Sequence, residues 1–79
     1  MVKVKVLGPG CSKCKLLEQK LINLRSSNQL DFEVEKVNQL DEIMSYGILM
    51  TPGLVINGQV KSSGTIPKDE QIINWIKEA

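Results

Sequence analysis

Apolar and polar positions alternate in two short stretches of the chain, which predicts two β-strands. In the first stretch, from Val2 to Leu7, valines alternate with lysines, and in the second, from Phe32 to Val37, apolar residues alternate with glutamates. A third apolar run, Leu54 to Ile56, is followed by Asn57-Gly58. Asn-Gly is the strongest short hairpin signal, so we expect the chain to return as a fourth strand from Val60 to Ser63.

Between these strands, apolar residues recur with the spacing of an α-helix. The first helix is predicted to open at Cys11 and to end at Ser26-Ser27-Asn28. Its apolar stripe consists of Cys14, Leu17, Leu21 and Leu24. A short second helix carries Leu40, Ile43 and Met44 and is closed by Gly47 as a left-handed cap. A last helix carries Ile72, Ile73 and Ile76.

The predicted order of elements is therefore βαβαββα. A helix joins the first two strands, so they should be parallel with a right-handed crossover, while the last two form an antiparallel hairpin. We expect an α/β fold in which residues 1–79 form a single domain, a mixed four-stranded sheet flanked by helices. The first strand should lie inside the sheet, with the hairpin extending one side.

Composition narrows the classes of partner. About 42% of the residues are apolar and 24% are charged, with 10 basic and 9 acidic side chains, as is ordinary for a globular domain. No strongly basic face is expected, which argues against nucleic acid as a partner. No signal peptide or stretch long enough to span a membrane is evident, so we expect a cytoplasmic monomer without membrane contact.

The two cysteines, Cys11 and Cys14, form a Cys-x-x-Cys pair where the first strand gives way to the first helix. Unpaired backbone N–H groups and the helix dipole stabilise a thiolate at such a position and lower the pKa of the thiol. Lys13 and Lys15 add positive charge nearby. Cys14 falls on the apolar stripe and should be the more buried sulfur, which predicts that Cys11 attacks and Cys14 resolves.

This pair has other possible interpretations. Two cysteines can lie close by chance, but a bridge that closes so small a loop would add little stability as a structural staple. Structural zinc needs four ligands, and the chain has two cysteines and no histidine. Two thiolates can still bind Cu(I). A soft-metal chaperone and a redox-sensing module that binds a partner thus stay as alternatives to an enzyme that needs no metal or organic cofactor.

Thr51-Pro52 is the second informative feature. Proline before a strand can be mere punctuation. Because it stands between a glycine-ended helix and a hairpin strand, we expect instead a cis bond, a conformation found chiefly before proline, beside the cysteine pair. The backbone of Thr51 would then pair with an extended substrate segment.

The segments 8–14, 46–52 and 54–58 together closely resemble the small thioredoxin-like redox-active disulfide proteins of archaea and bacteria. The resemblance covers essentially the whole chain. It implies a thioredoxin-like fold, a catalytic pair at Cys11 and Cys14, a cis proline at Pro52, and dithiol–disulfide exchange with protein or small-thiol disulfides, supported by a reductase. The motif residues Gly10, Ser12 and Lys13 are expected to support the pair.

The chain also departs from larger relatives. Thioredoxins carry a buried Asp six positions before the first cysteine, and Lys5 stands there instead. Proton transfer to and from the resolving thiol therefore cannot follow that route. Lys5 is expected either to face the cysteine pair or to be solvated, as strand lysines usually are. The Trp of thioredoxins and the Tyr with which glutaredoxins read glutathione are also missing from the cysteine motif, so the motif names no particular reductant.

Overall fold

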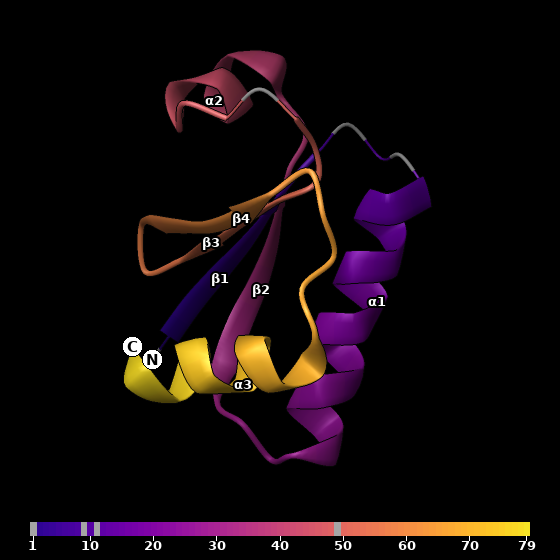
Figure 1. The fold of residues 1–79 in the computed structure, drawn as a ribbon, viewed down its shortest axis with the longest axis vertical. Coiled ribbons are helices and arrows are strands. Elements are labelled where there is room, and N and C mark those ends of the chain that lie inside the picture. The colour runs from indigo at the N-terminus through magenta and orange to yellow at the C-terminus, as the bar shows by residue number, and fades with distance from the viewer. Residues whose placement is uncertain (1, 9, 11, 49) are drawn as a thin grey trace.

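The computed structural model describes residues 2–8, 10, 12–48 and 50–79 of the chain. These residues form four strands and three helices in the predicted order (Figure 1). The strands are β1 (Val2–Leu7), β2 (Phe32–Val37), β3 (Gly53–Ile56) and β4 (Gln59–Ser63). The helices are α1 (Ser12–Ser27), α2 (Leu40–Ser45) and α3 (Asp69–Glu78).

The strands form one mixed sheet in the order β2-β1-β3-β4, which confirms the internal position predicted for β1. β1 pairs in parallel with β2, in a register that places Val6 beside Lys36, and it pairs antiparallel with β3. The hairpin between β3 and β4 turns at Asn57 and Gly58, both with positive φ. Two successive residues with positive φ are what a tight turn of this twist requires, so the hairpin prediction is confirmed.

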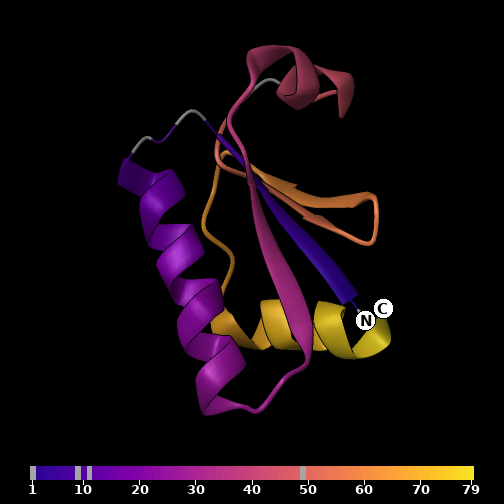
Figure 2. The same cartoon turned by 180° about the vertical axis from the view of Figure 1, so that it is seen from behind.

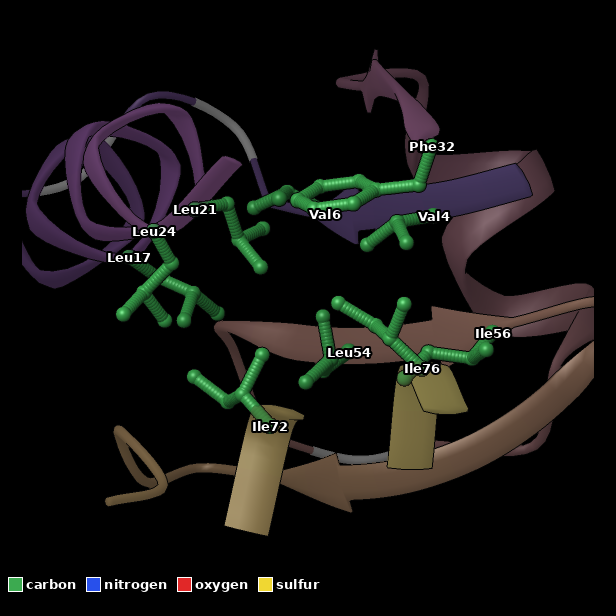
Figure 3. Packing of buried hydrophobic residues seen from close by; sticks show 10 residues of the cluster. All are labelled: Val4, Val6, Leu17, Leu21, Leu24, Phe32, Leu54, Ile56, Ile72 and Ile76. Atoms are coloured by element: carbon green, nitrogen blue, oxygen red, sulfur yellow. The ribbon is translucent and has the colours of Figure 1, made fainter. Parts of the chain in front are cut away.

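One face of the sheet carries the main core, which joins the sheet to α1 and α3 (Figure 3). The valines of β1 point toward the leucines of α1, and the isoleucines of α3 close the cluster from the other side. The main core consists of Val4, Val6, Leu17, Leu21, Leu24, Phe32, Leu54, Ile56, Ile72 and Ile76. Trp75 of α3 packs against this cluster.

The opposite face carries a smaller second core, which holds α2 against the sheet. It consists of Leu7, Val37, Ile43, Ile48 and Val55, with Tyr46 packed at its side. Gly47 follows α2 with φ +80°, and its N–H donates to the carbonyl of Met44 at 2.9 Å. Gly47 is thus the left-handed cap that the sequence predicts.

The two ends of the fold differ (Figures 1 and 2). α2, the start of α1 and the carboxyl end of β1 lie at one end, whereas α3 and both termini lie at the other. Lys20 of α1 ties the two helices of the main core together, since its ammonium lies 3.0 Å from Asp69 and donates to the carbonyl of Pro67 at 2.8 Å. No helix within the described part of the chain has the length and apolar character to cross a membrane.

Candidate active site

Cys14 lies in the first turns of α1 and faces the sheet, with about 5% of its surface exposed. It is disulfide-bonded, and its sulfur packs directly on the backbone of Gly8 at the end of β1. A Cβ placed on Gly8 would overlap the sulfur of Cys14, so glycine is what allows this approach. The predicted burial of Cys14 is confirmed. Its predicted nucleophilic partner, Cys11, lies outside the described residues.

The other residues of the cysteine motif surround Cys14 at the surface. Ser12 and Lys13 are exposed on the first turn of α1, which contains no acidic side chain. Gly10 is also exposed and has φ +92°, a conformation that favours glycine. The ammonium of Lys13 is therefore exposed to solvent, where salt screens its electrostatic effect on a nearby thiolate.

Thr51 and Pro52 are joined by a cis peptide bond, as the sequence predicted. The ring of Pro52 is fully buried, while Thr51 is half-buried. The carbonyl of Pro52 accepts a hydrogen bond from Gly64 N–H at 2.9 Å, which fixes the entry into β3. A Cβ placed on Gly8 would also lie 3.8 Å from the Cβ of Thr51. Cys14 and Thr51, 37 positions apart in the sequence, therefore both lie close to Gly8 at the end of β1.

A cavity of about 60 Å³ lies beside Cys14, on the main-core side of β1. Its walls include Val6, Cys14, Glu18 and Lys36. Glu18 follows Cys14 by four positions on α1, which places both side chains on the same helical face. Glu18 and Lys36 were not predicted from the sequence, although the spacing of four residues between Cys14 and Glu18 is a signal that could have identified Glu18.

Lys5 makes a different contact from either one expected. Its ammonium donates a hydrogen bond to the hydroxyl of Tyr46 at 3.2 Å and lies 5.9 Å from the centre of the same ring. The hydrogen bond and the partial charge of Tyr46 raise the pKa of Lys5 above its usual value, against a smaller opposing effect of desolvation. Glu35 and Glu42 add to this increase in pKa. Lys5 thus supports the end of α2 and does not line the cavity beside Cys14, whose wall contains its neighbour Val6.

The described residues contain no group of three or more histidine, cysteine, aspartate or glutamate side chains placed to hold a metal ion. The site combines a buried, disulfide-bonded sulfur, a close backbone approach at Gly8 and the cis bond between Thr51 and Pro52.

Comparisons with known proteins agree with this geometry. The family described as thioredoxin domain matches residues 2–77. The chain is 32% identical over 72 residues to a thioredoxin of Methanothermobacter thermautotrophicus, a match that covers 91% of this chain and 94% of the relative. It is 29% identical over 77 residues to a thioredoxin of Methanocaldococcus jannaschii, covering 98% and 88%.

Among solved structures, the germline-specific thioredoxin Deadhead of Drosophila melanogaster superimposes with a TM-score of 0.65 at 18% identity, covering 98% of this chain and 79% of the other. This likeness concerns the fold. The family match and the archaeal relatives go further, because they extend over nearly the whole chain. The chain therefore belongs to the thioredoxin family, as a small thioredoxin-domain protein similar to archaeal thioredoxins, and this membership implies a thiol–disulfide redox function.

Proposed function

We propose that this protein is a thiol–disulfide oxidoreductase that works by dithiol exchange through Cys11 and Cys14. The thiolate of Cys11 attacks a substrate disulfide and releases the first substrate sulfur as a thiolate. The thiolate of Cys14 then attacks the sulfur of Cys11 and releases the second one. The substrate disulfide gains two electrons and two protons, and the protein is left with an internal disulfide. A dithiol reductant reverses the change in the protein.

The observation that carries this proposal is the setting of Cys14. Its sulfur is buried, disulfide-bonded and packed on Gly8, a position suited to the second, internal step. A buried thiol reacts slowly with external reagents, so attack from outside falls to the other cysteine. The position of Cys11 one helical turn before Cys14 in the sequence fits this division of roles.

Thr51 supports the choice of a protein or peptide disulfide as substrate. Thr51 and Cys14 both lie close to Gly8, and unlike Pro52 the side chain of Thr51 is partly exposed. Its backbone leads directly into β3, so an extended segment that pairs with Thr51 would run beside the cysteine pair as an added strand does. Thr51 and Pro52 are therefore proposed as the substrate platform, with Gly10, Ser12 and Lys13 around the sulfurs.

Substitution of each cysteine tests the proposal. We expect Cys11→Ser to abolish the reduction of a protein disulfide, because no nucleophile is left for the first step. Cys14→Ser should stop after one step and accumulate a mixed disulfide that mass spectrometry detects. Ser26→Ala, at the far end of α1, is the control and should react as the parent does.

Two results would contradict the proposal. One is a Cys11→Ser variant that still turns over. The other is protein that, after purification under reducing conditions, retains Cu(I) in a 1:1 ratio against a competing chelator, since that behaviour belongs to a soft-metal binding module.

A further inference from the structure

Glu18 carries a buried carboxylate oxygen next to Cys14. Its Oε2 is buried, and no donor among the described residues is aligned to form a hydrogen bond with it. The ammonium of Lys36 lies 3.2 Å away, close enough for an ion pair. Lys36 is itself about 61% exposed, so this pair is a weak restraint on the carboxylate. A buried acceptor without a hydrogen bond is costly to the fold and calls for an explanation.

The cavity beside Cys14 supplies one. Cys14 and Glu18 both line it, and its volume of about 60 Å³ exceeds what a water molecule needs. A water there would have the carboxylate and the sulfur as polar neighbours. Glu18 is the one carboxylate among the described residues that line this cavity. Lys15 and Lys36 are the charged groups that line it with Glu18, from α1 and β2.

Glu18 also reaches the outside. About 26% of its side chain is exposed, on the side of a surface groove that it lines together with Arg25, Glu35 and Lys36. These are the charged groups that face it from α1 and β2. One side chain thus borders both the cavity at the sulfur and the surface groove, which is the placement that a proton carrier requires.

We propose that Glu18 accepts the proton of the Cys14 thiol during the second step of exchange, through water in this cavity, and returns it when the protein is reduced. The inference rests on the function proposed above. As the proton leaves Cys14, the Cys14 thiolate bonds to the sulfur of Cys11, and the electron pair of the broken bond departs with the substrate thiolate. The glutamic acid then loses its proton to solvent. When the disulfide is reduced, Cys14 leaves as a thiolate and takes a proton back from Glu18.

The location of Lys5 leaves this role to another residue of the cavity wall. Proton exchange with a buried thiol needs an acid–base group within reach directly or through one water. Lys5 is directed to Tyr46, across the sheet from the cavity. Glu18 lines the same cavity as the sulfur of Cys14, and it is carried by α1, whereas Lys5 is carried by β1.

The test follows the two steps separately. Reduced protein is mixed with a chromogenic aromatic disulfide, dithiobis-nitrobenzoate, which releases one coloured thiolate when Cys11 attacks and a second when Cys14 resolves. We expect Glu18→Gln to leave the first phase unchanged and to slow the second about tenfold or more at pH 7, the usual size of a lost acid–base contribution. The defect should shrink to about twofold by pH 9, because hydroxide from solvent then removes the proton in place of the carboxylate.

Two further variants sharpen the result. Glu18→Asp keeps a carboxylate and should restore most of the second phase. Glu33→Gln removes the same charge from an exposed position on β2 and should change neither phase. A carboxylate that acted merely as a nearby negative charge would raise the pKa of Cys14, so its removal would speed the second phase at pH 7.

A second phase of Glu18→Gln that equals or exceeds the parent rate at pH 7, or a slow phase whose defect is the same at pH 7 and pH 9, would overturn the inference. Absence of the first phase in the parent protein would instead overturn the function on which it rests. The two failures are therefore distinguishable in one experiment.

Discussion

The ammonium of Lys5 and the hydroxyl of Tyr46 are hydrogen-bonded at 3.2 Å, although 41 positions separate the two residues. Lys5 lies on the internal strand β1, and Tyr46 directly follows α2, between its last residue and Gly47. The bond therefore fastens the start of the segment that leads to Thr51 onto the middle of the sheet. It also gives the ammonium of Lys5 a hydrogen-bond acceptor within the fold.

Tyr46→Phe should lower the pKa of Lys5, because the hydroxyl is the main cause of its increase while the ring is retained. A raised pKa in the folded state means stabilisation that is complete below the ordinary value of 10.5 and is lost as pH rises through the folded value. The difference in unfolding free energy between parent and variant should therefore hold through neutral pH and shrink in strong alkali. NMR titration of the Lys5 side chain checks the shift. Identical titrations in the two proteins would show that the bond is not formed in solution.

Alkylation should distinguish the two thiols of the reduced protein. Cys14 is about 5% exposed, so we expect iodoacetamide near pH 7 to modify Cys11 at least about tenfold faster. Peptide mapping after a short reaction measures the ratio. Protein unfolded in urea is the control and should lose the preference. Faster labelling of Cys14 in the folded protein would reverse the roles assigned to the two cysteines.

Gly8→Ala should cost about 1–3 kcal/mol of stability, because the added methyl group would overlap the sulfur of Cys14. A double-mutant cycle isolates this contact. In a Cys14→Ala background the sulfur is gone, so the same change at Gly8 should cost less than half as much. Chemical denaturation of all four proteins under reducing conditions provides the values. Equal costs in both backgrounds would mean that the sulfur does not rest on Gly8.

Much of the fold follows from local patterns. The alternation in β1 and β2, the Asn57-Gly58 turn and the Gly47 cap are each decided by neighbouring residues, and the structure bears out each of them. The burial of Leu7 could not be predicted from the alternating pattern alone, because it depends on tertiary packing. Leu7 occupies the position in β1 that the lysines occupy, yet it is fully buried, because α2 covers this end of the second face.

Features of the site that depend on the spacing of residues within one helix or strand could be predicted from the sequence, whereas contacts between different elements could not. The burial of Cys14, for example, was predicted from its position on the apolar stripe of α1. The pairs Lys5–Tyr46 and Glu18–Lys36 depend on how a helix and a strand distant in sequence pack together, which no local period reports. Glu18 could nevertheless have been predicted to lie near Cys14, since a residue four positions after a buried cysteine lies on the same helical face.

Thr51→Lys should discriminate between classes of substrate. Thr51 lies beside Cys14 and is proposed to pair with an extended substrate segment, so a long charged side chain there should hinder a polypeptide more than a small molecule. We expect kcat/KM to fall about tenfold for a protein disulfide, roughly 1.4 kcal/mol of transition-state binding, with little change for a small aromatic disulfide. Ser63→Lys, an exposed position on β4, serves as control. Equal losses for both substrates would remove the platform role of Thr51.

The division of the apolar interior into two cores bears on how the site can open. α1, with Cys14, is anchored in the main core through Leu17, Leu21 and Leu24, whereas α2 and Ile48 are held by the smaller second core. Local opening requires far less free energy where few apolar contacts must be broken. The α2 side of the site therefore has the lower free-energy cost of local opening. We expect a bulky partner to displace α2 while α1, which holds the sulfur of Cys14, stays in place.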